Sequence, residues 1–189
     1  CSCSRKQIIE RCDSIIYDRH CLSIPPNTTD KNAIRVKTQD ALISFRDIIQ
    51  GPHAYDLNRT GDFVIFRRDG LFAYQLAVTV DDYLQGVTHV VRGSDLLDET
   101  ARQIHLQQIL GYPTPAYAHI PVATNADGQK LSKQTYAPAL NTTDPVPVLF
   151  EALEFLDQNP PASLLKASRS ELLEWAIEHW NIRKIANTK

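Results

Sequence analysis

The sequence predicts an α/β fold, on three observations. Residues 71–80 form an apolar run, free of Gly and Pro and rich in β-formers, and such a run is typical of a buried strand. Residues 87–91 form a second strand-like run. Residues 94–110 then carry apolar side chains at helical spacing, with Ser94 or Asp95 as the N-cap. Strands followed directly by a helix indicate an α/β core.

The elements before this core are short. Residues 6–16 have helical character, a linker follows Pro25-Pro26, and Gly51-Pro52 is expected to break the chain. The turn signal Asp69-Gly70 predicts that residues 62–66 pair with residues 71–80 as a hairpin. The strands predicted in this part are residues 33–37, 41–45 and 62–66.

The elements after the core are mainly helical. Gly111 and Pro113 are expected to end the central helix, and residues 117–122 read as a short strand. Asp144-Pro145 predicts a helix that runs to about residue 156. A capping-box pattern, Ser168 with Glu171, predicts a last helix that reaches Trp180.

Composition excludes several classes of protein. The 189 residues are 43% hydrophobic and 22% charged, as in an ordinary globular protein. A net charge of −2 gives no overall electrostatic attraction for nucleic acid, so an RNA contact needs a local patch. No apolar run reaches the length of a membrane span and no secretory signal is visible, which makes the cytoplasm the expected compartment. The sequence has no Met and begins Cys-Ser-Cys, so we expect that its amino-terminal part is missing.

All the cysteines lie within the first 21 residues. Such clustering indicates a metal knuckle, because structural zinc takes four soft or borderline ligands around a small loop. The alternative is a set of free thiols in a helical segment. Ligand chemistry alone favours Cys1, Cys3 and Cys21 with either Cys12 or His20, and it ranks Tyr17 low because phenolate ligation is unusual.

Three further features suggest a substrate site. Tyr74 and Arg92 are polar residues among apolar segments, and Arg92 lies where a strand ends and a helix begins, the usual place of a ligand crevice in α/β sheets. The guanidinium group of Arg92 can bind a carboxylate through two parallel hydrogen bonds, although a structural ion pair with a nearby acid is an equal alternative. His119 is interpreted as a histidine packed in the interior and not as a catalytic residue. Residues 130–134, KLSKQ, follow a Gly-containing turn and could hold phosphate, but solvated loop lysines look the same.

The order of four motifs resembles the class I glutamyl-tRNA synthetase family. The motifs are DFVIFRRDGLFAYQLAVTVDD, GVTHVVRGSDLL, GYPTPAYAHIPV and KLSKQ. The resemblance covers nearly the whole chain, from Cys1 to the helix around Trp180. It is strongest to the short members that lack an anticodon-binding domain.

This resemblance implies a fold in three parts. Residues 1–61 would be a zinc-knuckle insertion with short strands. Residues 62–140 would be the second part of a Rossmann-type catalytic core, including the KLSKQ loop, and residues 141–189 a helical carboxyl-terminal region. The HIGH-type motif and the early glutamate-binding residues of the family have no counterpart in this sequence.

The resemblance also implies the roles of residues. One Zn²⁺ per chain would be bound by Cys1, Cys3, Tyr17 and Cys21, a set that replaces Cys12 or His20 as the fourth ligand. Tyr74 and Arg92 would contact L-glutamate, and Lys133 would contact ATP. The KMSKS-like loop would consist of Lys130, Leu131, Ser132, Lys133 and Gln134.

The implied activity of the intact enzyme is ATP-dependent activation of glutamate, with Mg²⁺, and transfer of the glutamyl group to queuosine at the wobble position of tRNA(Asp). Only 55 residues follow the KLSKQ loop, too few for an anticodon-reading domain. We expect a monomer without membrane contact, and no activity from this fragment alone. The alternatives are a fragment of an ordinary glutamyl-tRNA synthetase and a non-catalytic zinc-knuckle RNA-binding module.

Overall fold

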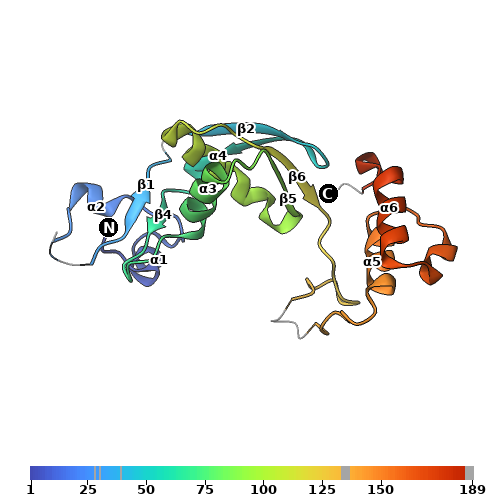
Figure 1. Ribbon diagram of the computed structural model, residues 1–189. Helices are drawn as coiled ribbons and strands as arrows, with labels where there is room; N and C mark the ends of the chain where they lie inside the picture. The colour runs from blue at the N-terminus through green and yellow to red at the C-terminus, as the bar shows by residue number, and fades with distance from the viewer. Residues whose placement is uncertain (28, 30, 39, 133–136, 186–189) are drawn as a thin grey trace. The chain divides into compact units, whose positions relative to one another are not determined.

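The computed structural model describes residues 1–189 except 28, 30, 39, 133–136 and 186–189 (Figure 1). Its strands pair two by two, and helices lie between them in the sequence. In chain order the elements are α1 Arg5–Cys12, α2 His20–Ser23, β1 Ile34–Val36, β2 Leu42–Asp47, β3 Gly51–Asp56, η1 Leu57–Arg59, β4 Phe63–Phe66, α3 Tyr74–Leu84, β5 His89–Gly93, η2 Ser94–Leu96, α4 Leu97–Leu110, β6 Ala116–Ile120, α5 Pro145–Phe155, η4 Ala162–Lys166, α6 Arg169–His179 and η5 Ile182–Lys184.

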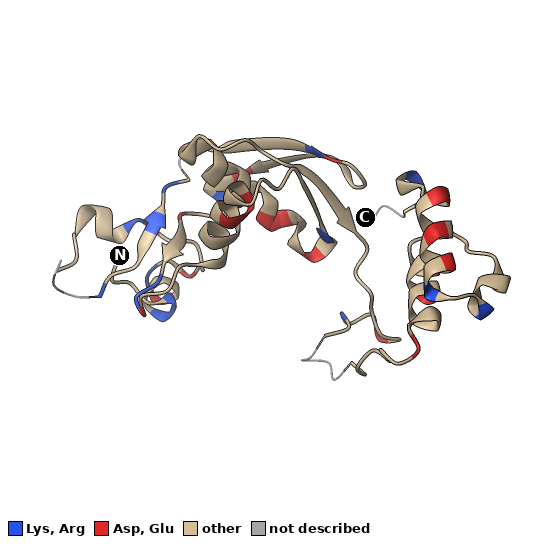
Figure 2. Cartoon of the chain, in the orientation of Figure 1, with Lys and Arg blue, Asp and Glu red and all other residues tan. Residues whose placement is uncertain are grey.

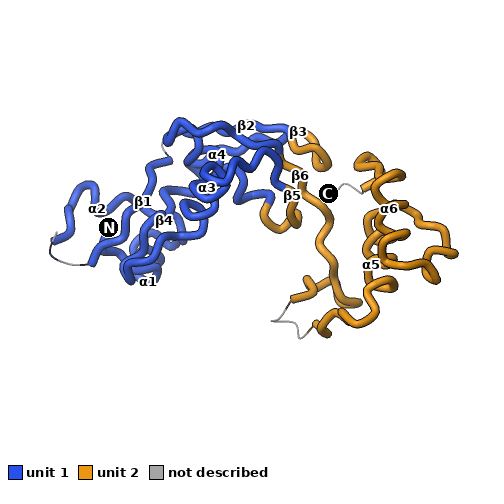
Figure 3. Tube along the Cα trace, in the orientation of Figure 1, with its two compact units in different colours: residues 1–46, 52–90, 97–116 blue, residues 47–51, 91–96, 117–189 orange. Residues whose placement is uncertain are grey.

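The chain divides into two compact units (Figure 3). Unit 1 comprises residues 1–46, 52–90 and 97–116, and unit 2 comprises residues 47–51, 91–96 and 117–189. The three-part division expected from the resemblance stays a prediction. In the part of the chain that the structure describes, no helix is long and apolar enough to cross a membrane.

The core of unit 1 joins a strand pair to a helix. Strand β1 pairs antiparallel with β4, and Val36 lies opposite Phe63. These two residues form a buried cluster with Leu106 of α4. Ile65 packs against this cluster as well, so the helix covers one face of the strand pair. The helix predicted for residues 94–110 therefore contributes an apolar side chain, Leu106, to the packing against the strand pair.

Residues 71–80 are a correction: they are mainly the helix α3, not a strand. Gln75 and Thr79, four residues apart, lie on one helical face, where Gln75 accepts a hydrogen bond from Gln103 of α4 at 2.9 Å. Thr79 is buried, and its hydroxyl donates to the Gln75 carbonyl at 2.8 Å. Packing against α4 selects the helix, because β-propensity is a weak preference that tertiary contacts override.

The predicted hairpin of residues 62–66 with 71–80 forms only at its start. The Asp69-Gly70 turn is present, with Gly70 at a φ of 86°. After the turn, Phe72 bridges to Phe66, the Arg67 N–H donates to the Leu71 carbonyl at 2.8 Å, and the Ala73 N–H donates to the Ile65 carbonyl at 2.9 Å. From Tyr74 onward the chain is helical, and β1 is the strand that pairs with β4.

Gly51-Pro52 does not break the chain either. Gly51 has a φ of 82°, a value that favours glycine, and it starts β3 after a tight turn from β2. The carboxylate of Asp47 accepts hydrogen bonds from the backbone N–H groups of Ile49 and Gln50 at 2.9 and 2.8 Å and so closes this turn.

The strand-to-helix junction predicted after residue 91 is confirmed. Strand β5 ends at Gly93, a 3₁₀ turn follows, and α4 runs from Leu97 to Leu110. Strand β6 pairs with β5. The described strands form two-stranded sheets, so the architecture is mixed α/β.

The carboxyl-terminal part of unit 2 is a helix pair. Helix α5 begins with Pro145, and α6 begins with the predicted capping box, in which Ser168 and Glu171 bond reciprocally. Val146, Phe150, Leu153 and Leu172 form their shared buried cluster. Acidic residues lie along α6, whereas Lys and Arg are frequent around α1 and β1 (Figure 2).

Candidate functional site

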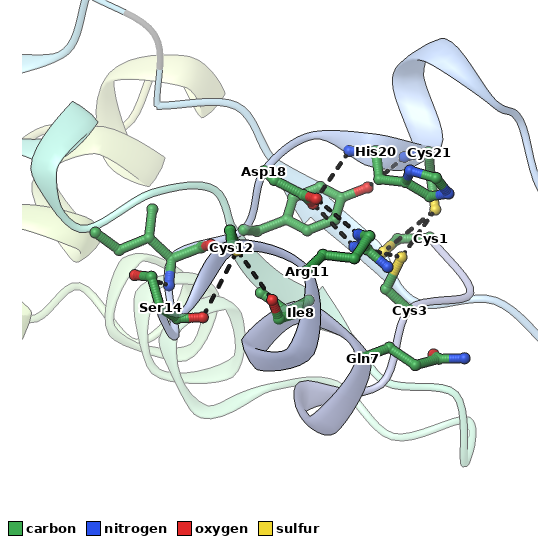
Figure 4. Close-up of polar contacts among 12 residues, drawn as sticks. Cys1, Cys3, Gln7, Ile8, Arg11, Cys12, Ser14, Asp18, His20 and Cys21 are labelled. Carbon is green, nitrogen blue, oxygen red and sulfur yellow. Dashed lines mark hydrogen bonds and ion pairs between the residues drawn. The ribbon is translucent and has the colours of Figure 1, made fainter.

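Three of the four cysteines come together at the amino terminus of unit 1 (Figure 4). The Sγ atoms of Cys1, Cys3 and Cys21 all lie within 4.8 Å of one another. The Cys3–Cys21 distance is 3.4 Å, and the Cys21–Cys1 distance is 3.7 Å. The side chain of Cys21 reaches this cluster from α2, while the other two come from the segment before α1.

These distances fit a zinc ion. Ligands at about 2.3 Å in a tetrahedron lie about 3.8 Å apart, close to the separations of the three sulfur atoms. All three cysteines are free thiols. The donor set is thus of the kind that a structural zinc takes, and a fourth donor would complete it.

Tyr17 lies beside this cluster. Its hydroxyl oxygen accepts a hydrogen bond from the backbone N–H of Cys21 at 2.9 Å, and its side chain is buried. Burial, followed by the bond to Cys21, raises the pKa of Tyr17 to about 12. Burial also raises the pKa of Cys21, but hydrogen bonds led by the Tyr17 hydroxyl lower it to about 6. The thiol of Cys21 therefore ionises more easily than the hydroxyl of Tyr17. Tyr17 as the fourth ligand stays a prediction.

Cys12 lies apart from the cluster. Its Sγ donates to the backbone carbonyl of Ile8 at 2.9 Å, one helical turn away, and the residue is exposed. His20 is partly buried. Among the residues that the structure describes, the group of potential metal ligands that lie close together consists of the three cysteines and does not include His20. The geometry thus groups the three cysteines shared by both predicted ligand sets.

Charged pairs hold the knuckle in place. Arg19 donates through Nε and Nη2 to both carboxylate oxygens of Asp62, at 3.0 and 2.9 Å. Arg11 pairs in the same way with Asp18. The guanidinium of Arg35 lies 4.4 Å from the centre of the Tyr17 ring. These contacts fix the loop between α1 and α2, from which Tyr17 projects.

The second group of candidate residues lies in unit 2, around Arg92 of β5. The side chain of Arg92 is partly buried, and its Nε donates to Nε2 of His119 at 3.1 Å. Its guanidinium carbon lies 5.4 Å from the centre of the Tyr117 ring. These contacts are with a ring nitrogen and an aromatic face. These two contacts do not test the alternative of a structural ion pair, which stays open together with the predicted carboxylate contact.

His119 is fully buried, as its interpretation as a packed histidine predicted. Its Nδ1 lies 2.6 Å from Oδ2 of Asp47, which is also buried. Burial raises the pKa of Asp47, but hydrogen bonds from the Gln50 backbone, from His119 and from Ile49 outweigh it and hold that pKa below its usual range. Asp47 is therefore a carboxylate near neutral pH.

Tyr74 is placed differently from its prediction. It is the first residue of α3, and about half of its surface is exposed. Tyr74 belongs to unit 1 and Arg92 to unit 2. A joint role of the two in binding one substrate stays a prediction.

The first part of the KLSKQ loop lies close to the end of β5. Nζ of Lys130 donates to Oδ2 of Asp95 at 2.5 Å. Thr124 and Lys130 form an antiparallel bridge, and Leu131 N–H donates to the Ala123 carbonyl at 2.8 Å. Ser132 is partly buried. Lys133 and Gln134 lie outside the described residues, so the ATP contact of Lys133 stays a prediction.

Three residues near Arg92 and Lys130 were not predicted as site residues from the sequence: Asp47, Gln50 and Asp95. The side-chain amide of Gln50 donates to the His119 carbonyl at 2.7 Å. Asp47 and His119 are 72 residues apart. A local signal existed only for Asp95, which lies three residues after Arg92 at the end of a strand.

The family comparison identifies a known catalytic domain. Residues 4–144 match the family described as tRNA synthetases class I (E and Q), catalytic domain. The matched region contains Tyr17, Tyr74, Arg92 and Lys130.

Curated relatives match almost the whole chain. Glutamyl-Q tRNA(Asp) synthetase of Aromatoleum aromaticum is 49% identical over 96% of this chain, and that of Thiobacillus denitrificans is 49% identical over 98%. The Salmonella choleraesuis protein of the same name is 45% identical over 98%. The chain spans 59%, 63% and 61% of the lengths of these relatives.

Solved structures agree on the fold. A glutamate-tRNA synthetase from Elizabethkingia anophelis superposes with a TM-score of 0.68 at 25% identity, covering 96% of this chain and 43% of its own. A glutamate tRNA ligase from Elizabethkingia meningosepticum, in complex with its amino acid, gives a TM-score of 0.71 at 21% identity, with coverages of 97% and 43%.

Proposed function

We propose a function from one premise: the chain belongs to the class I tRNA synthetases of the glutamate and glutamine group. The protein that contains it activates L-glutamate with ATP, releasing pyrophosphate, and transfers the glutamyl group to queuosine at the wobble position of tRNA(Asp). The observation that carries this proposal is the identity of 45–49%, along 96–98% of the chain, with relatives named glutamyl-Q tRNA(Asp) synthetase.

The reaction needs position and positive charge more than a protein nucleophile. The glutamate carboxylate attacks the α-phosphate of ATP, and pyrophosphate leaves with the electrons of the broken P–O bond. We propose that Arg92 and Tyr74 bind glutamate, with Arg92 on a carboxylate. Lys133 acts on ATP, and Mg²⁺ accompanies the nucleotide. The contact between Lys130 and Asp95 joins the start of the KLSKQ loop to the turn that follows β5, which supports a role of the loop near Arg92.

The zinc knuckle is the proposed place of tRNA contact within unit 1. Residues 1–37 carry seven Lys and Arg residues against four acids, although the whole chain has a net charge of −2 (Figure 2). A local basic surface of this kind meets the phosphate backbone of RNA. We propose Cys1, Cys3, Tyr17 and Cys21 as the ligands of one Zn²⁺. The tRNA substrate implies a cytoplasmic protein, which we propose acts as a monomer.

The test uses the full-length protein, ATP, labelled glutamate and two purified tRNAs: tRNA(Asp) with queuosine and tRNA(Glu). We expect label on tRNA(Asp) only. A matched tRNA(Asp) with guanine in place of queuosine should stay unlabelled, because the proposed acceptor is then absent.

Two other results would each overturn the proposal. Label on tRNA(Glu) and not on tRNA(Asp) would assign the chain to an ordinary glutamyl-tRNA synthetase, the function named for the solved structures above. Binding of tRNA without any glutamate-dependent pyrophosphate exchange would identify a non-catalytic RNA-binding protein.

A further inference from the structure

A row of three polar side chains runs from the β2–β3 turn to Arg92 in unit 2. Oδ2 of Asp47 lies 2.6 Å from Nδ1 of His119, and Nε2 of His119 lies 3.1 Å from Nε of Arg92. Asp47 and His119 are fully buried, whereas Arg92 is partly exposed. The row thus leads from the interior to Arg92, a side chain that is proposed to touch the substrate.

The hydrogen-bond chemistry of this row determines where the histidine proton lies. Arginine is always protonated, so Nε of Arg92 donates and Nε2 of His119 accepts. The proton of the neutral imidazole is therefore on Nδ1, from which it is donated to Asp47. A carboxylate is the partner that favours this tautomer, because it accepts and does not donate.

Asp47 itself is rigidly held. Its Oδ1 accepts from the backbone N–H groups of Ile49, Gln50 and His119, at 2.9, 2.8 and 3.1 Å. Oδ2 is thereby directed at the imidazole. Tyr117 stacks on the imidazole ring, with 6.1 Å between the ring centres. The imidazole has little freedom to turn away from Arg92.

We propose that His119, oriented by Asp47, is a positioning residue that holds the guanidinium of Arg92 for the carboxylate of glutamate. This inference rests on the proposed function. The bond to Nε directs the edge formed by Nη1 and Nη2 toward the substrate, and that edge binds a carboxylate with two parallel hydrogen bonds. Arginine has many rotamers, and holding one of them before the substrate arrives lowers the cost of binding.

The first test separates the two links of the row in the full-length protein. In Asp47→Asn, the amide takes the place of Oδ2 and donates to Nδ1, so that the histidine proton moves to Nε2 and faces the Arg92 Nε–H. We expect a roughly tenfold or larger increase in the KM for glutamate in pyrophosphate exchange, because pre-positioning of the fork is lost. The KM for ATP should stay within about twofold.

Two substitutions of the histidine itself follow the same logic. His119→Asn keeps an amide at the level of Nδ1 but does not reach Arg92, so we expect a similar increase in the glutamate KM. His119→Gln places an amide oxygen near the level of Nε2 and should recover part of the loss. Equal glutamate KM values for the native protein and for His119→Asn would overturn the proposal.

A double-mutant cycle tests whether His119 acts through Arg92. Arg92→Lys lacks the Nε–H bond, so adding His119→Asn to it should change the glutamate KM by less than about twofold. A full tenfold effect in the lysine background would overturn the positioning role while leaving the proposed function intact. If Arg92→Lys itself has a normal glutamate KM, the assignment of Arg92 as a substrate contact is wrong, and the inference fails with it.

Gln158→Ala is the matched control for a structural effect. Gln158 is also a buried polar residue of unit 2, and its amide oxygen accepts from the Asn181 backbone at 2.8 Å, away from Arg92. The Gln158→Ala variant should have a lower thermal stability than the native protein but the same glutamate KM.

Nitrogen chemical shifts of the His119 ring in the native protein give a readout that needs no variant. We expect the proton on Nδ1, and a proton on Nε2 would overturn the proposal.

Discussion

Cys12 and Cys21 show how strongly surroundings separate two residues of one type. Cys12 donates to a carbonyl of its own helix, whereas Cys21 lies within 3.7 Å of the sulfur atoms of Cys1 and Cys3. We expect one zinc ion per chain in the native protein. The zinc content of the Cys21→Ala variant should be much lower, because zinc needs its thiolate ligands, whereas the Cys12→Ala variant should keep the zinc content of the native protein. Elemental analysis of the purified variants measures this.

The fourth ligand is decided by a second pair of variants. Tyr17→Phe should weaken zinc binding more than His20→Ala does, because the Tyr17 hydroxyl is the one next to Cys21. A competition assay with a chelator ranks the two affinities. The reverse order would show that ligand chemistry, which favoured His20, describes the site better than the family resemblance.

Arg92 is the residue on which the proposed chemistry depends most. Arg92→Ala in the full-length protein should reduce kcat/KM for glutamate by roughly thirty- to several-hundred-fold, corresponding to about 2–4 kcal/mol for a lost charge-assisted contact. Arg92→Lys should retain only part of the native kcat/KM, because an ammonium group cannot form the two parallel hydrogen bonds of a guanidinium group. Pyrophosphate exchange is the measurement, and a near-normal rate in Arg92→Ala would reject the assignment.

Asp47 gives a prediction about pH. Its pKa in the folded protein is below the ordinary value of 3.8, so the carboxylate stabilises the fold above that value. This contribution is lost as the pH falls through the folded pKa, because the folded state then takes up its proton as well. Asp47→Asn should therefore lower the free energy of unfolding by about 2 kcal/mol near neutral pH. The difference from the native protein should narrow below about pH 3.8.

Denaturant unfolding at several pH values measures this dependence. A destabilisation that grows toward acid pH would contradict the expected sign.

At the scale of elements, the α5–α6 pair offers a comparison between neighbouring leucines. Leu172 has 0% of its surface exposed and packs in the buried cluster with Phe150, whereas Leu173 is 42% exposed. Leu172→Ala should cost about 3 kcal/mol of unfolding free energy, since it leaves a cavity as well as losing apolar burial. Leu173→Ala should cost less than about 1 kcal/mol. Denaturant unfolding of both variants tests this, and equal losses would contradict the packing of α6.

At the scale of the whole molecule, we expect metal removal to act locally. The amino-terminal segment is held by a small buried cluster of Cys3, Ile8 and Tyr17, and by paired backbone bonds between Cys1 and Ala33 at 2.6 and 2.9 Å. So few contacts cannot replace a bound metal. Chelation should thus reduce hydrogen-exchange protection of the amides of Ile8 and Ala33, and leave that of Leu172 unchanged.

Hydrogen exchange of the intact protein with and without a chelator provides the measurement. Cys12→Ala is the control, because it should respond to the chelator as the native protein does. Equal loss of protection in α6 would show that the zinc knuckle stabilises the protein as a whole.

The sequence by itself determined the features that depend on local order. The capping box at Ser168, the Pro145 start of α5 and the strand-to-helix junction at Arg92 are each written in a few neighbouring residues, so they could be predicted. The clustering of the cysteines and the order of the motifs also identified the family, because motif order survives large changes elsewhere in a chain.

Only the tertiary structure decided the features that depend on distant partners. Residues 71–80 have the composition of a strand, and the packing of α3 against α4, with the bond between Gln75 and Gln103, makes most of them helical. Likewise, the strand that pairs with β4 is β1, which lies far from it in the sequence, while the segment just after β4 adds a single bridge at Phe72. The bond between Asp47 and His119 spans 72 residues, and no local pattern encodes so distant a partner. Burial makes that bond strong, and burial is a property of the folded chain.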